Sequence, residues 1–155
     1  MADAQVDIIR GNAAEIAWFA GVDFSSQGID ATGDGDVRKI AIMAAKKTGA
    51  IIALSGKQDV ISDGHTTHTI DVDVPLLATN VGTGDALSAL IGTYNGDGIS
   101  IENTVRAMAT MKLAGIKANT KVKTPGYFVN QLLDELYLLT EDELDGFIQS
   151  EVAHD

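Results

Sequence analysis

The sequence has no cysteine, only two prolines and 5% aromatic residues among its 155 positions. Without cysteine, disulfides, thiolate metal sites and a cysteine nucleophile are all excluded. Basic residues are also scarce: 11 Lys and Arg stand against 22 Asp and Glu, a formal charge of −11. This balance excludes the basic surface typical of nucleic-acid-binding and polybasic membrane-binding proteins. The acidic balance does not exclude phosphate ligands, because helix N-termini and glycine-rich turns bind anions locally.

Long apolar runs are absent as well. The longest, such as residues 40–45, are far too short to cross a bilayer. No basic segment followed by an apolar one opens the chain, so we expect a cytoplasmic location. With 45% hydrophobic and 21% charged residues, the composition suits a folded protein, and we expect one domain over residues 1–155.

Hydrophobic spacing predicts an α/β fold, with helices packed on a central sheet. Strands are expected at residues 6–9 and 50–54, and a hairpin at 59–62 and 66–74 around an Asp-Gly turn. A polar loop is expected at 25–35. Helices are expected at residues 13–19, 36–48, 86–93, 101–117 and 125–139, with a last helix after Thr140. Ser100 is expected to cap the helix at 101–117, and Thr140 and Glu143 form a capping-box pattern for the last helix. The apolar face of the 125–139 helix is expected in a core or subunit interface.

The segment from Val81 to Leu87 carries the strongest chemical signal. A glycine-rich turn, Gly82-Thr83-Gly84, separates a strand-like segment from a helix, and such a turn aims backbone amides at an anion. Asp85 lies just inside the helix. Aspartate is ordinarily ionised at neutral pH, so it can accept a proton from an alcohol while the amides stabilise a phosphoryl group. Asp85 can equally be an ordinary acidic residue at a helix start.

Asn12 and Glu15 also support two interpretations. Asn followed three residues later by Glu is a capping-box pattern. The same side chains can hold a water-bound Mg²⁺ ion, which prefers oxygen ligands. Arg10 can reach phosphate oxygens with its planar guanidinium group or pair with a surface carboxylate.

Two further groups are weaker candidates. His65 and His68 lie three apart in an expected strand, which places them on opposite faces as exposed hairpin residues. Lys117, Lys121 and Lys123 form a small basic loop before Pro125, which is expected to be solvated.

Three ordered motifs together resemble hydroxyethylthiazole kinases. The motifs are Ile9-Arg10-Gly11-Asn12-Ala13-Ala14-Glu15-Ile16, Asp59-Val60-Ile61-Ser62-Asp63-Gly64 and Gly82-Thr83-Gly84-Asp85-Ala86-Leu87-Ser88-Ala89, followed by Pro125-Gly126-Tyr127-Phe128 and an acidic helix. The resemblance implies a ribokinase-like three-layer sandwich, present in part. It also implies a kinase that uses ATP and Mg²⁺ to phosphorylate the primary alcohol of hydroxyethylthiazole in thiamine salvage. Such enzymes are typically homotrimers with active sites between subunits.

The resemblance also implies roles for single residues. Asp85 matches the catalytic position, and Gly82 matches a glycine that lines the thiazole pocket. Arg10 and Ser55 match ATP contacts, with Ser55 in place of the usual threonine. From the glycine-rich turn itself, the amides of Thr83 and Gly84 are expected to bind the phosphate together with that of Gly82. Asn12 and Glu15 match the magnesium-associated Asn-x-x-Glu, acting through water.

The chain departs from the family pattern in two ways. Many thiazole kinases carry cysteine where this chain carries Asp85, whereas other ribokinase-like enzymes carry aspartate. A kinase of a sugar, vitamin or pyrimidine is therefore an alternative. The resemblance also covers only the C-terminal portion of such a kinase. We therefore expect a truncated gene product, a fragment or one chain of a split enzyme, with a separate N-terminal segment as a partner. Exposed apolar surface and an unpaired sheet edge would then favour self-association. A catalytically inactive nucleotide-binding or assembly fragment is the other alternative.

Overall fold

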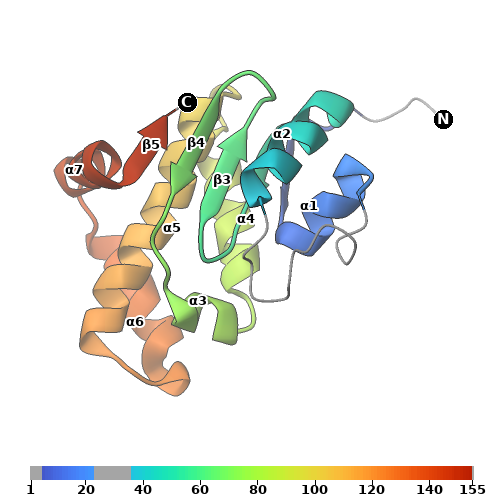
Figure 1. Ribbon diagram of the computed structural model, residues 1–155. Helices are drawn as coiled ribbons and strands as arrows, with labels where there is room; N and C mark the ends of the chain where they lie inside the picture. The colour runs from blue at the N-terminus through green and yellow to red at the C-terminus, as the bar shows by residue number, and fades with distance from the viewer. Residues whose placement is uncertain (1–4, 23–35, 155) are drawn as a thin grey trace. The chain divides into compact units, whose positions relative to one another are not determined.

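The computed structural model describes residues 5–22 and 36–154, so the expected loop at 25–35 lies outside the described residues. Figure 1 follows the elements along the chain. They are β1 (Ile8–Gly11), α1 (Ala13–Ala20), α2 (Val37–Thr48), β2 (Ile51–Leu54), β3 (Asp59–Ser62), β4 (Thr67–Ile70), α3 (Pro75–Thr79), α4 (Thr83–Tyr94), α5 (Ile101–Lys121), α6 (Pro125–Leu138), α7 (Glu141–Glu151) and β5 (Val152–His154).

The strands form one mixed sheet in the order β1-β2-β3-β4-β5, with β1 at an edge. β1 runs parallel to β2 in a register that pairs Ile9 with Ile52 and Arg10 with Ala53. β3 runs antiparallel to β2 and pairs Val60 with Leu54. Sheet and helices together confirm the predicted α/β class.

The chain divides into two compact units, which we describe separately. The first unit comprises the described residues of 1–69 and 153–155, and the second comprises Ile70–Val152. No helix in the described part of the chain combines the length and apolar composition that a membrane crossing requires.

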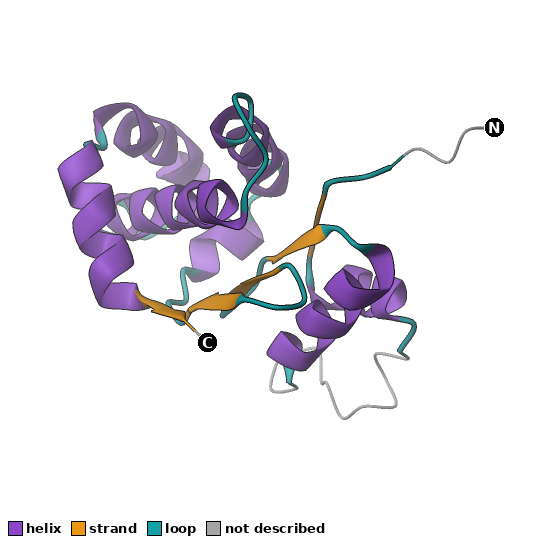
Figure 2. Ribbon diagram, turned by 90° about the horizontal axis from the view of Figure 1, so that it is seen from above, coloured by secondary structure: helices purple, strands orange, loops and turns teal. Residues whose placement is uncertain are grey.

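In the first unit, α1 and α2 lie side by side and pack on the sheet (Figure 2). Since side chains alternate along a strand, one face of the sheet meets both helices and supplies Ile52, Leu54 and Val60 to their common core. The predicted apolar face of α2 is buried throughout, namely Val37, Ile40, Ala41, Ala44 and Ala45. The helix ends as predicted at Gly49, whose φ of 75° only glycine adopts readily.

In the second unit, α5 packs against α4, α6 and α7. Ser100 caps α5, and Thr140 with Glu143 forms the predicted capping box of α7. The predicted apolar face of α6 is divided. Phe128 and Leu132 are buried, whereas Val129 and Leu133 are 36% and 54% exposed.

Several sequence-based expectations about elements and their boundaries were wrong. The second hairpin strand ends at Ile70, because Pro75 fixes the backbone at the start of a short helix, α3, that the sequence analysis did not predict. The helix predicted to end at residue 117 runs to Lys121, since no glycine or proline lies between residue 117 and Pro125. The short strand β5 was not predicted at all.

Candidate functional site

In the first unit, the carboxyl ends of the parallel strands β1 and β2 lie together. The amide of Ser55, one residue past β2, donates a hydrogen bond to the carbonyl of Gly11 over 2.9 Å. Ligands of open α/β sheets bind outside the carboxyl ends of the strands. Arg10, Asn12, Glu15 and Ser55, which the sequence analysis singled out, all lie at or directly after these two strand ends.

Arg10 lies on the face of the sheet turned away from α1 and α2. Its neighbour Ile9 packs against the core beneath those helices, and adjacent strand residues point to opposite faces. Arg10 is half-buried, and its Nε atom is buried without a hydrogen-bond partner among the described residues. Because an unsatisfied buried donor costs free energy, this nitrogen is suited to an anionic ligand oxygen.

Asn12 and Glu15 form a capping box at the start of α1. The Glu15 amide donates to Asn12 Oδ1 over 3.0 Å, and the Asn12 amide donates to Glu15 Oε2 over 2.8 Å. Gly11 makes room for this arrangement, since a Cβ atom at that position would lie 3.0 Å from Glu15 Oε2. Glu15 is exposed, and its second oxygen, Oε1, accepts no hydrogen bond within the described ranges 5–22 and 36–154.

The turn after Ser55 depends on a residue that the sequence analysis did not assign. The Gly56 amide donates to Oδ1 of Asp59 over 3.0 Å, and Asp59 is buried. This bond closes the connection from β2 to β3 and orients the segment that carries Ser55. The signal in the sequence is an aspartate three residues after the glycine of a short turn, a typical side-chain-to-backbone bond.

In the second unit, α4 begins with an uncapped N-terminus. Gly82 precedes the helix with a φ of 96° and no side-chain cap, and Asp85 lies in the first turn. By contrast, α1, α2, α5 and α7 are capped by Asn12, Asp36, Ser100 and Thr140. The first amides of a helix have no intrahelical acceptor. Those of Thr83, Gly84 and Asp85 therefore remain suited to an anion, and the first two belong to the predicted set of Gly82, Thr83 and Gly84.

The segment before Gly82 is not a strand, contrary to the sequence-based prediction. It is the end of α3 followed by a turn in which Val81 is fully exposed. The Thr83 hydroxyl donates to the carbonyls of Leu77 over 2.7 Å and Asn80 over 3.0 Å, which closes this turn. The Thr83 side chain is thus occupied by backbone contacts, and its amide is the group that remains for a phosphate.

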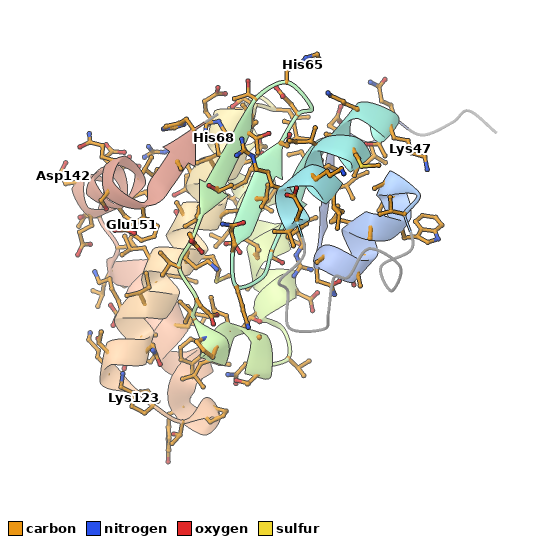
Figure 3. All side chains as sticks on the ribbon, in the orientation of Figure 1. Lys47, His65, His68, Lys123, Asp142 and Glu151 are labelled. Carbon is orange, nitrogen blue, oxygen red and sulfur yellow. The ribbon has the colours of Figure 1, made fainter. Side chains whose placement is uncertain are left out.

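His68 is not the exposed hairpin residue that was predicted. His65 is exposed at the tip of the hairpin, but His68 is only 8% exposed (Figure 3). Nδ1 of His68 lies 2.8 Å from Nδ1 of His154 in β5, a strand that the sequence analysis had not foreseen. Among the described residues, no group of three or more His, Asp or Glu side chains is arranged to hold a metal ion.

The predicted basic loop is also absent. Lys117 and Lys121 lie on α5 and donate to Glu143 and Glu135, each over 2.6 Å. Lys123, labelled in Figure 3, follows the helix and donates to the carbonyl of Asn119. Because α5 continues past the predicted boundary, Lys117 and Lys121 lie on the helix and pair with α7 and α6, whereas Lys123 bonds back to α5 itself.

Comparison with known proteins identifies the relatives of this chain. The model of the hydroxyethylthiazole kinase family matches residues 1–142. A hydroxyethylthiazole kinase of Leuconostoc citreum is 68% identical over 152 residues, which cover 98% of this chain and 59% of that protein. Hydroxyethylthiazole kinase 1 of Leuconostoc mesenteroides is 59% identical over 154 residues, which cover 99% of this chain and 60% of that protein. The chain therefore spans about three fifths of the length of these relatives.

A solved structure supports the same relationship. The hydroxyethylthiazole kinase of Pyrococcus horikoshii matches with a TM-score of 0.80 and 28% identity, over 97% of this chain and 55% of that one. The fold is therefore ribokinase-like, and the resemblance inferred from the three motifs is confirmed.

Proposed function

The chain belongs to the hydroxyethylthiazole kinase family, and on that premise we propose that it carries catalytic residues of an ATP-dependent kinase. The acceptor is the primary alcohol of hydroxyethylthiazole, and the reaction serves thiamine salvage. The observation that carries this proposal is the N-terminus of α4, where uncapped amides and an exposed aspartate adjoin a glycine with positive φ.

Asp85 is the proposed general base. It removes the proton of the alcohol, whose oxygen forms a bond to the γ-phosphorus of ATP as the bond to the ADP oxygen breaks. The amides of Thr83 and Gly84, with that of Gly82, stabilise the negative charge on the transferred phosphoryl group. Gly82 also lines the thiazole pocket.

Arg10 and Ser55 are the proposed ATP contacts of the first unit. The buried Nε of Arg10, which has no acceptor within the part of the chain that the structure describes, supports this role. A guanidinium group binds phosphate oxygens strongly because its donors are charged and planar. The hydroxyl of Ser55 lies at the carboxyl end of β2, beside the end of the strand that carries Arg10.

Glu15 and Asn12 are the proposed magnesium-associated residues, acting through water. Carboxylate and amide oxygens fit this ion, and Glu15 keeps one oxygen outside the capping box. When bound, Mg²⁺ supplies neutralisation of the phosphate charge. Glu15 and Asn12 orient its water ligands.

We further propose that the working protein is a cytoplasmic homo-oligomer, a trimer by resemblance to the family. A separate segment that completes the thiazole pocket belongs to the same proposal. Because Asp85 stands where many family members carry cysteine, a sugar, vitamin or pyrimidine alcohol is the alternative acceptor. A panel of such alcohols therefore belongs in the test below.

The decisive test incubates the purified chain, alone and together with the separate segment that completes the pocket, with Mg²⁺, ATP and hydroxyethylthiazole, and detects the phosphate ester by mass spectrometry. We expect product from the parent and from the control Asp97→Asn, which removes an exposed carboxylate beyond the far end of α4. Asp85→Asn should lose at least about a hundredfold in rate while ATP binding is retained. Equal rates for Asp85→Asn and the parent would exclude Asp85 from the mechanism. ATP binding by the parent without any product would favour a nucleotide-binding or assembly fragment.

A further inference from the structure

The turn that leads into α4 has almost no side-chain packing to hold it. Val81 is fully exposed, and among the described atoms outside its chain neighbours none lies within 4 Å of the position that a Cβ of Gly82 would occupy. Gly82 itself adopts a positive φ, and its lack of a side chain leaves its backbone with more conformational freedom than that of other residues. Some other interaction must therefore fix the direction in which the amides of this turn point.

The Thr83 hydroxyl supplies that interaction. It donates to the carbonyls of Leu77 and Asn80, over 2.7 and 3.0 Å, at the C-terminal end of α3. The last carbonyls of a helix need external donors. One side chain of α4 therefore satisfies the end of α3 and ties the two helices together at the turn.

Leu77 is in turn seated on α5. A Cβ on Gly115 would lie 3.0 to 3.4 Å from three side-chain carbons of Leu77, so the absence of a side chain at Gly115 admits Leu77. A glycine within a long helix lowers the stability of the helix relative to alanine. Its presence at position 115 is explained by the space that it leaves for Leu77. The series of contacts runs from Gly115 through Leu77 to Thr83, all within the second unit.

We propose that Thr83 is the positioning residue of the phosphate-binding turn, with its hydroxyl holding the amides of Gly82, Thr83 and Gly84 in a fixed orientation. This inference rests on the proposed function for the identity of the ligand. The orientation of the turn by Thr83 is measured in the free protein without ligand. The proposed function can therefore fail while the role of Thr83 holds, and the role of Thr83 can fail while the proposed function holds.

The test compares Thr83→Val, which keeps the branched shape but loses the hydroxyl, with Thr83→Ser, which keeps the hydroxyl. Thr93→Val is the matched control, because the Thr93 hydroxyl bonds only to the Ala89 carbonyl at the other end of α4 among the described residues. The first readout is hydrogen exchange, by NMR, of the Ala86 amide, which donates to the Gly82 carbonyl over 2.9 Å.

We expect Thr83→Val to speed exchange of the Ala86 amide by about tenfold, the usual consequence of losing one hydrogen bond. Thr83→Ser and Thr93→Val should leave this exchange rate close to that of the parent. Unchanged exchange in Thr83→Val, or equal acceleration in Thr83→Ser, would overturn the proposal.

The second readout separates positioning from general stability. Thr83→Val should raise the KM for ATP by about tenfold while the KM for the alcohol stays constant, and Thr83→Ser should restore the ATP value. Parallel changes in both KM values would overturn the positioning role. A parent protein that fails to bind ATP would count against the proposed function alone, because the exchange experiment still decides the role of Thr83.

Discussion

Asn12 and Glu15 cap each other at the start of α1, with each side chain accepting a hydrogen bond from the backbone amide of the other. The two residues proposed to organise magnesium therefore also stabilise the helix on which they lie. A substitution that removes either side chain would change folding and metal binding together. Variants that keep the capping bonds are needed to separate these roles.

Glu15→Gln is such a variant, since glutamine keeps the capping bond but carries no charge. We expect its free energy of unfolding to stay within about 0.5 kcal/mol of the parent, whereas Glu15→Ala should lose about 1 kcal/mol. Glu15→Gln should nevertheless need about tenfold more Mg²⁺ for half-maximal turnover, a typical cost of disturbing a metal site. Urea denaturation and a Mg²⁺ titration measure the two effects, and an unchanged Mg²⁺ requirement would leave Glu15 as a helix cap alone.

The ion pair of Lys121 and Glu135 leads to a prediction about folding stability. Glu135 is 1% exposed, and its Oε1 accepts hydrogen bonds from Lys121 Nζ over 2.6 Å and Gln131 Nε2 over 2.8 Å. The hydrogen bond from Lys121 is the main cause that holds the pKa of Glu135 below its ordinary value. Burial acts in the opposite direction and raises the pKa, but by less. Removing the Lys121 amine leaves the buried Glu135 carboxylate with the hydrogen bond from Gln131 but without its positively charged donor.

Lys121→Met should therefore destabilise the protein by about 1 to 3 kcal/mol. Lys123→Met is the control, because it removes a neighbouring amine that bonds to a backbone carbonyl instead. The double variant Lys121→Met/Glu135→Leu should recover most of the loss, since an apolar side chain then takes the place of the buried carboxylate that has lost its partner. Chemical denaturation measures the free energy of unfolding of the parent, the two single variants and the double variant. A double variant no more stable than Lys121→Met would contradict the argument.

Glu143 predicts a specific sensitivity to acid. The hydrogen bond from Lys117, and then that from the Thr140 amide, lowers the pKa of Glu143 from 4.5 to about 2. Because the folded pKa lies below the unfolded one, the contribution of this group to stability is complete above pH 4.5. It is lost progressively as the pH falls from 4.5 towards 2.

Glu143→Gln should accordingly flatten the decline of the urea midpoint across that pH range, because glutamine retains the capping bonds but does not titrate. Asp142→Asn is the matched control. It removes a carboxylate, labelled in Figure 3, from the same first turn of α7, and among the described acidic side chains of this turn only Glu143 takes part in the capping box. Equal slopes for Glu143→Gln and the parent would show that the Lys117 contact does not persist in solution.

Features that depend on a few neighbouring residues were predictable from the sequence. The capping boxes at Asn12 and Thr140, the cap at Ser100 and the glycine end of α2 each rest on residues within four positions. The buried face of α2 follows from helical periodicity in the same way. The glycine-rich turn before Asp85 was likewise recognisable, because an uncapped helix start with glycine is a local pattern.

Features that depend on distant partners were not predictable. His68 is buried against His154, 86 positions later in the chain, in a strand that is too short to recognise. The supporting contacts of the turn before α4 likewise join Leu77 to Gly115 and Thr83 to α3. Nothing in the local pattern around Val81 distinguishes a buried strand from an exposed turn.

The sequence by itself thus determined most of the helices, their caps and the family motifs, because these are set by backbone preferences and spacing over a few residues. Tertiary structure alone decided which motif side chains are already engaged. The Thr83 hydroxyl is bound to α3, and the Arg10 Nε is buried with no acceptor among the residues described. The physical reason is that burial and hydrogen bonding depend on segments brought together by packing, which local sequence does not encode.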